Sequence, residues 1–165
     1  MGNGNWFAST PHHVGLVVGD LTAAMNAYIE DFGYTFFQFE VNERNAALSG
    51  SSASFSLRFG IGQFGLNLIE LIQPLSGTTI YSQHLTQRGP GLHHLAFSVS
   101  DLNAARQQLA ARGYPCLQDG AIRGFVNFSY FEAQGMACIV EPLQLSADLL
   151  AFLAQSAETY LPKPR

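Results

Sequence analysis

The stretch His12-His13-Val14-Gly15-Leu16-Val17-Val18-Gly19-Asp20-Leu21-Thr22-Ala23-Ala24 recurs later as His93-His94-Leu95-Ala96-Phe97-Ser98-Val99-Ser100-Asp101-Leu102-Asn103-Ala104-Ala105. Both copies keep the paired histidines, the Asp-Leu step and the Ala-Ala step at the same spacing. A second match follows, in which Ile69-Glu70-Leu71-Ile72-Gln73 corresponds to Val140-Glu141-Pro142-Leu143-Gln144. The chain is therefore predicted to contain one structural unit twice, and each unit contributes a histidine and a glutamate.

Each copy is predicted to form a strand, a helix and three further strands. Residues 13–18 alternate as a strand does, and Asp20 is a good N-cap for an amphipathic helix that ends at Gly33. In the second copy Asp101 and Gly113 delimit the equivalent helix. The later strands are expected at 35–41, 53–59, 66–72, 116–118, 125–131 and 137–143, with residues 74–91 as a link that contains turns.

These elements predict an α+β fold built from two βαβββ modules. The first module is expected at residues 11–74 and the second at residues 90–145. A C-terminal helix is expected at residues 146–162, and the three parts together form one structural domain.

Composition narrows the class of protein. The chain has 165 residues, of which 47% are hydrophobic and 12% are charged, so it can bury a substantial core. A net charge of −4 and a single lysine, Lys163, argue against binding to nucleic acid or to anionic membranes. Cys116 and Cys138 provide no disulfide framework, and no apolar run has the length of a membrane span. We therefore expect a cytoplasmic, soluble protein.

The repeated histidines lie on strand faces with little bulk. His13 shares a face with Gly15 and Val17, and His94 shares one with Ala96. We expect these small neighbours to leave open space above the strands. By the same alternation, His12 and His93 are expected on the opposite face, which makes them weaker candidates.

The two glutamates lie within nearly continuous apolar strands. A buried, ionised carboxylate is costly unless it is paired or coordinated, and no Arg or Lys has the right alternation to pair with Glu70 or Glu141. One divalent ion would bind both carboxylates together with neutral His13 and His94. Two nitrogen and two oxygen ligands suit Zn, Ni, Co, Fe or Mn, with positions left for water or substrate.

With these residues, the sequence resembles the vicinal oxygen chelate superfamily, which includes glyoxalase I, methylmalonyl-CoA epimerase, extradiol dioxygenases and bleomycin-resistance proteins. The resemblance covers residues 11–145 and is strongest to the epimerase branch at 13–18, 69–74 and 89–97. It implies a curved, open mixed sheet that forms a cup around one divalent metal. By resemblance the metal ligands are His13, Glu70, His94 and Glu141.

The resemblance implies abstraction of a proton alpha to a carbonyl, with Glu141 or Glu70 as the base and the metal as a Lewis acid. Epimerases typically carry a glutamine at the position of Glu70, whereas glyoxalase I carries a glutamate. The segment around Glu40 and Glu43 also departs from the epimerase pattern. An epimerase, isomerase or lyase is expected, with a glyoxalase I-like lyase as one alternative.

Two further alternatives are a non-catalytic binding protein of the resistance type and an extradiol-type dioxygenase. The retained set of four ligands argues against the first, and the extra acidic ligand argues against the second. The expected partner is a small molecule, either hydrophobic or an acyl-CoA, and the expected assembly is a homodimer. No separate organic cofactor is expected.

Overall fold

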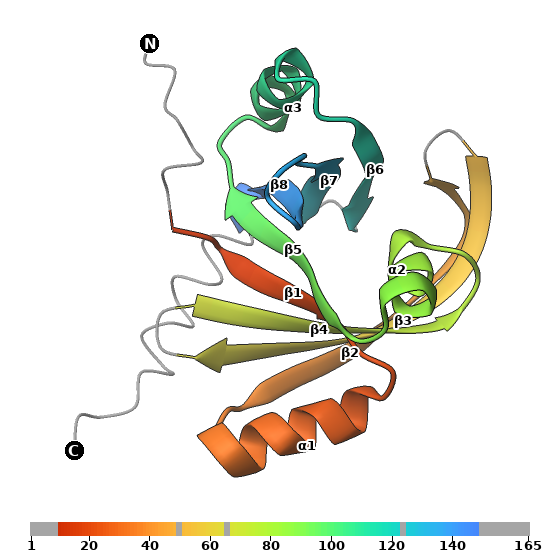
Figure 1. Cartoon of the computed structure of the whole chain (residues 1–165), viewed down its shortest axis with the longest axis vertical. Coiled ribbons are helices and arrows are strands. Elements are labelled where there is room, and N and C mark those ends of the chain that lie inside the picture. The colour runs from red at the N-terminus through yellow and green to blue at the C-terminus, as the bar shows by residue number, and fades with distance from the viewer. Residues whose placement is uncertain (1–9, 49–50, 65–66, 123–124, 149–165) are drawn as a thin grey trace.

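The computed structural model describes residues 10–48, 51–64, 67–122 and 125–148, and these form a curled half-barrel sheet with three helices (Figure 1). In chain order the elements are β1 (His13–Val17), α1 (Leu21–Phe32), β2 (Phe36–Leu48), β3 (Ser51–Phe64), β4 (Asn67–Ser76), α2 (Ile80–Arg88), β5 (Gly91–Ser98), α3 (Leu102–Ala111), β6 (Cys116–Ile122), β7 (Val126–Glu132) and β8 (Ile139–Leu145). The predicted α+β class is confirmed.

The eight strands form one mixed sheet in the order β2-β3-β4-β1-β5-β8-β7-β6. In each half the first strand pairs in parallel with the last, β1 with β4 and β5 with β8. The two halves meet where β1 pairs antiparallel with β5, at the centre of the sheet (Figure 1). The repeated sequence therefore forms repeated structure, and the first strands of both copies lie side by side.

In each module an aspartate and a glutamine form hydrogen bonds with the backbone at the start of the helix. Asp20 accepts a hydrogen bond from the backbone N–H of Ala23, and Asp101 accepts one from Ala104. A glutamine from the last strand of the module adds a second link. Gln144 accepts from the backbone N–H of Leu102 and donates to the carbonyl of Ser100, as Gln73 does at the first helix. The two matched glutamines therefore have a structural role: each joins the last strand of its module to the start of the helix.

Replacing Gln144 with alanine is expected to destabilise the protein by about 1–3 kcal/mol, because two hydrogen bonds at the start of α3 are lost. Urea unfolding measures the loss. Gln107→Ala, on the exposed side of the same helix, is the control and should change stability by less than about 0.5 kcal/mol. Equal stabilities of the two variants would show that the Gln144 hydrogen bonds do not stabilise the start of α3.

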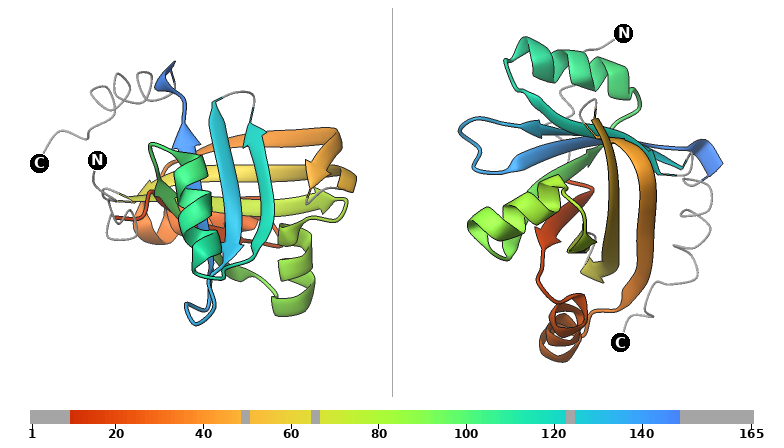
Figure 2. Two further views of the ribbon diagram at one scale, coloured as in Figure 1. Left: turned by 90° about the horizontal axis from the view of Figure 1, so that it is seen from above. Right: turned by 90° about the vertical axis from the view of Figure 1, so that its right-hand side faces the viewer.

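The two faces of the sheet carry different helices. We call the face that carries Val17 and Ile72 the inner face; these residues pack with Tyr81 of α2. Leu16 and Leu71 belong to the outer face and pack with α1. Figure 2 shows α1 and α3 at opposite ends of the molecule, each beside its own module. The inner-face cluster also contains Tyr130 of β7, so residues of both modules pack together on this face.

Helix α2 corrects the expectation that residues 74–91 are a link containing turns. β4 continues to Ser76, and a helix begins after Thr79, whose side chain and that of Ser82 form a reciprocal capping box. The apolar residues Ile80, Tyr81 and Leu85 all pack into the inner-face cluster. Ile80, Tyr81 and Leu85 have helical spacing, but the turn residues on both sides of the segment predict a link instead.

The remaining differences concern the ends of elements. β2 and β3 are much longer than the predicted 35–41 and 53–59 and form an extended hairpin. At the end of the first helix, Phe32 is 66% exposed, so it does not belong to the buried face of this amphipathic helix. The expected C-terminal helix at 146–162 falls almost entirely outside the described residues. None of the helices in the described ranges is long and apolar enough to cross a membrane.

Candidate metal centre

Four adjacent central strands carry the four candidate ligands, His13 on β1, Glu70 on β4, His94 on β5 and Glu141 on β8. The register explains why they meet. Gly15 pairs with Glu70 on one side and with His94 on the other, so the two ligands flank the same point of β1. Glu141 pairs with Ala96, which in turn pairs with His13. Residues far apart in the chain are thus brought to one place.

The ligand atoms of these side chains converge. The Nε2 atoms of His13 and His94 are 3.0 Å apart. Oε2 of Glu141 lies 3.2 Å from each of these nitrogens, and Oε2 of Glu70 lies 3.5 Å from each. Ligands at about 2.0–2.2 Å from one ion lie about 3.0–3.6 Å from each other. The separations are those of adjacent ligands around a single cation.

The donor set also fits a metal ion on chemical grounds. His13, Glu70 and His94 form a group in which the ligand atoms all lie within 4.8 Å of one another. Glu141 belongs with them by its contacts to both imidazoles, yet its buried Oε2 makes no directed hydrogen bond. In the described part of the chain, no arginine or lysine pairs with either glutamate. The ligand atoms of the four side chains therefore surround a common point where a cation would fit.

Electrostatics couple the four groups. Burial lowers the pKa of His13, but the two carboxylates outweigh burial and raise that pKa to about 10. The pKa of His94 is likewise raised, because Glu141 and Glu70 offset its burial. Burial alone would raise the pKa of Glu70 and Glu141, but the imidazoles hold both below the ordinary value. The carboxylates favour the protonated imidazoles. A bound divalent ion would replace these protons as the positive charge between the carboxylates.

Gly15 makes the space for one of the ligands. A Cβ atom at this position would lie 1.9 Å from Cε1 and 2.3 Å from Nε2 of His94. The open space expected above β1 is therefore filled at this point by the His94 ring. Only glycine allows the imidazole to lie across the strand.

His93 does not lie where strict alternation placed it. The pairing of β1 with β5 passes from Gly15–His94 to Leu16–Leu92, which leaves His93 unpaired in a bulge. Its ring packs against Tyr81, with ring centres 5.0 Å apart, and Tyr81 belongs to the inner-face cluster. The expectation that His93 faces away from the site is wrong, because a bulge breaks the alternation.

Both histidine pairs have the same internal contact. Nδ1 of His12 lies 3.0 Å from Nδ1 of His13, and Nδ1 of His93 lies 3.0 Å from Nδ1 of His94. A histidine that binds metal through Nε2 carries its proton on Nδ1 and needs an acceptor there. Burial lowers the pKa of His93 to about 3, so its ring is neutral and able to accept. The preceding histidine thus orients each candidate ligand.

Two tyrosines beside the cluster were not singled out in the sequence. Tyr81 from α2 and Tyr130 from β7 join their hydroxyl groups at 2.7 Å, and the Tyr130 ring contacts His94 edge-on. Burial and the nearby glutamates raise the pKa of both hydroxyls well above the ordinary value, so they stay protonated. The spacing of Tyr81 in α2 was the available signal.

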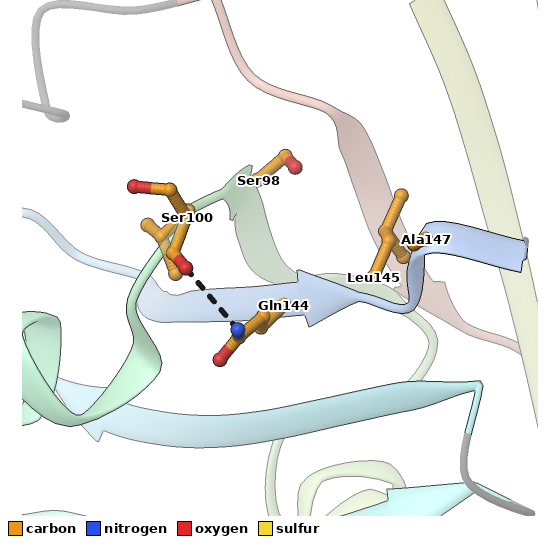
Figure 3. A pocket seen from close by; sticks show the side chains of 6 residues that line it. Ser98, Ser100, Gln144, Leu145 and Ala147 are labelled. Carbon is orange, nitrogen blue, oxygen red and sulfur yellow. Dashed lines mark hydrogen bonds between the residues drawn. The ribbon is translucent and has the colours of Figure 1, made fainter. Parts of the chain in front are cut away.

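A cavity of about 470 Å³ lies elsewhere, lined by Ser98, Val99, Ser100, Gln144, Leu145 and Ala147. Figure 3 shows it beside the Gln144 amide that bonds to the backbone of Ser100. None of the four candidate ligands lines it. The metal-ligand cluster, and not this cavity, is the candidate functional site.

Comparison with known proteins identifies the family to which this fold and this cluster belong. A family model described as the glyoxalase/bleomycin resistance protein/dioxygenase superfamily matches residues 12–130, and the chain belongs to this superfamily. A search of curated proteins finds no significant match. The expected membership of the vicinal oxygen chelate fold is confirmed.

Solved structures of this fold are similar to the chain at low identity. Methylmalonyl-CoA epimerase from Mycobacterium tuberculosis is 22% identical, with a TM-score of 0.65 over 86% of this chain and 91% of that one. A variant of the Streptomyces coelicolor epimerase in complex with 2-nitronate-propionyl-CoA is 17% identical, with a TM-score of 0.66 over 84% and 99%. A mutant 4-hydroxymandelate synthase from Streptomyces coelicolor is 16% identical, with a TM-score of 0.59 over 83% and 49%. These likenesses show a shared fold.

Proposed function

We propose that the protein is a metal-dependent epimerase, isomerase or lyase that removes a proton alpha to a carbonyl group. The observation that carries the proposal is the convergence of two imidazoles and two carboxylates on one point of the inner face. His13, Glu70, His94 and Glu141 would hold one divalent ion, for which Zn, Ni, Co, Fe and Mn are the candidates. When bound, the ion supplies a Lewis acid for a developing negative charge on oxygen.

The chain's own groups would move the proton. Glu70 and Glu141 are the bases available at the site, and each must turn toward the substrate carbon to accept a proton from it. Glu70 has the more accessible side chain, 15% exposed against 6% for Glu141. His13 and His94, held by the histidines that precede them, would keep their positions while one carboxylate moves.

The substrate that we propose is a small carbonyl compound, either a hydrophobic one or an acyl-CoA. Stacked aromatic rings of Phe39 and Phe59, with centres 5.1 Å apart, line the inner-face cluster and supply an apolar wall. The complex of the Streptomyces coelicolor epimerase with an acyl-CoA analogue supports a thioester. A glyoxalase I-like lyase is the second candidate, because the oxygen of Glu70 lies among the ligands and glyoxalase I resembles this chain there.

Solvent deuterium exchange tests the proposed reaction. We expect metal-loaded protein to exchange the alpha proton of at least one 2-substituted acyl thioester or hydroxy-ketone, measured by NMR or mass spectrometry. Chelator-treated protein should lose the exchange and regain it when the metal is restored. Exchange that is absent across the panel would contradict proton abstraction, and exchange that ignores the metal would contradict the proposed centre. Oxygen uptake with a catechol by the iron-loaded protein would instead favour the dioxygenase alternative.

A further inference from the structure

A buried glutamine on β6 makes no hydrogen bond through its side chain. Gln118 is only 6% exposed, and within the described ranges of the chain its side-chain amide has no hydrogen-bond partner; its backbone carbonyl accepts from the Cys116 thiol. In the same part of the chain, the fully enclosed unpaired side-chain atoms are Nε2 of His93 and Oε2 of Glu141, so the Gln118 amide still reaches open space. A buried amide without partners is unfavourable and calls for a ligand.

The register of β6 places the Gln118 side chain on the inner face. Gln118 pairs with Tyr130, which belongs to the inner-face cluster. Leu117 also packs into this cluster, because a register shift in β6 turns both side chains to the same face. The next residue, Asp119, lies on the opposite face, where it accepts a hydrogen bond from Arg106 of α3. The unpaired amide is therefore on the face that carries the metal centre.

Gln118 lies in the same row of the sheet as a candidate metal ligand. The β7–β8 register pairs Phe131 with Val140, so the preceding residue Tyr130 lies opposite the following residue Glu141. Neighbouring strands are about 4.8 Å apart, which puts the Gln118 backbone about 10 Å from that of Glu141. The glutamine side chain covers part of this distance. A molecule whose oxygens bind at the centre can therefore reach the amide with a group a few bonds away.

The first module has no amide at the equivalent place. Its corresponding row runs from Glu70 to Ile61 and then to Phe37, which is 69% exposed. The two modules thus match in their metal ligands but differ beside them, since one offers an amide and the other an apolar ring. A ligand with one polar end would bind in a single orientation, with that end toward Gln118.

We propose that Gln118 is a specificity-determining residue whose side-chain amide pairs with an amide group of the substrate. The ligand class is a carbonyl compound that carries an amide a few bonds from the oxygens held at the metal centre. An amide both donates and accepts, as the glutamine does, whereas a carboxylate would leave the glutamine oxygen unpaired. This inference rests on the proposed function, because it assumes that ligand oxygens reach the centre.

The stability of Gln118→Leu tests whether the amide is kept for a ligand. An unpaired amide does not stabilise the fold, so leucine, which has a similar size, should leave the urea midpoint of the ligand-free protein unchanged or raise it. A fall as large as that expected for Gln144→Ala would show that the amide bonds within the protein, and this would overturn the inference.

Probe binding to Co²⁺-loaded protein tests the ligand class without catalysis. Succinamohydroxamate and isocaprohydroxamate have the same chelating end and differ at the far end, which is an amide in the first and an isopropyl group of the same shape in the second. Cobalt absorption should show that the wild type binds the amide probe about fivefold or more tightly. Gln118→Leu should lose this preference and bind acetohydroxamate, which has no far end, within about twofold of the wild type. Gln107→Leu, on the exposed side of α3, is the control and should keep the preference.

The outcomes separate this inference from the proposed function. A wild type without the preference, or a Gln118→Leu variant that keeps it, would overturn the inference and leave the proposed function standing if acetohydroxamate still binds. An equal loss of all three probes in Gln118→Leu would show that the glutamine supports the centre itself, which also overturns the inference. A wild-type cobalt protein that does not respond to acetohydroxamate would contradict the proposed function and this inference with it.

Discussion

Glu141→Gln is expected to lower the affinity of the protein for a divalent ion by about 100-fold or more. The carboxylate oxygen lies 3.2 Å from both imidazole Nε2 atoms, and a neutral amide replaces an anionic ligand with a much weaker one. Glutamine keeps the size of the side chain, so the effect comes from the lost charge. Metal content after reconstitution and competition with a chelator give the affinity.

Glu132→Gln is the matched control for this substitution, because Glu132 lies at the exposed end of β7. It should bind metal as the wild type does. The prediction is contradicted if Glu141→Gln also binds with wild-type affinity. It is contradicted as well if fewer than about a tenth of wild-type chains hold a divalent ion after reconstitution, since a site of this donor set should fill.

The second large effect is expected from Gly15→Ala. The new methyl group would overlap the His94 ring, whose Cε1 lies 1.9 Å from the ideal Cβ position. The ring must rotate away, and its Nε2 then leaves the point that the other ligands share. We expect metal affinity to fall by about 100-fold or more, as for the loss of a ligand.

Gly19→Ala serves as the control for Gly15→Ala. A Cβ at Gly19 meets nothing within 4 Å, and this glycine has no left-handed backbone conformation to protect. Its metal affinity should equal that of the wild type. Equal affinities of Gly15→Ala and wild type would mean that His94 is not a ligand in the position described. Circular dichroism of both variants checks that the sheet is retained.

Much of the fold could be predicted from the repeat. Asp20 and Asp101 mark the helix starts, and the alternation around His13 and His94 marks the first strand of each module. These signals are local and occur twice, so an accidental match in one copy is not duplicated in the other. The candidate site followed for the same reason, because a glutamate in the last strand of each copy joins the histidine of the first.

The rest depended on features that local patterns do not encode. The bulge that turns His93 inward arises from pairing between two distant strands, and alternation within one strand cannot reveal it. Helix α2 lies between the turn-forming residues Pro74 and Gly89 and is only nine residues long, so its helical spacing is a weak signal beside the turn signals. Tyr81 meets Tyr130 because α2 places it against the inner face, and no local pattern in the sequence joins these two residues.

Locating the ion directly in metal-loaded protein tests the central claim best. Anomalous diffraction from a crystal loaded with zinc or cobalt should show one ion per chain at about 2.0–2.3 Å from Nε2 of His13, Nε2 of His94 and carboxylate oxygens of Glu70 and Glu141. An anomalous peak at any other place, or no peak between these four side chains in a loaded crystal, would contradict it.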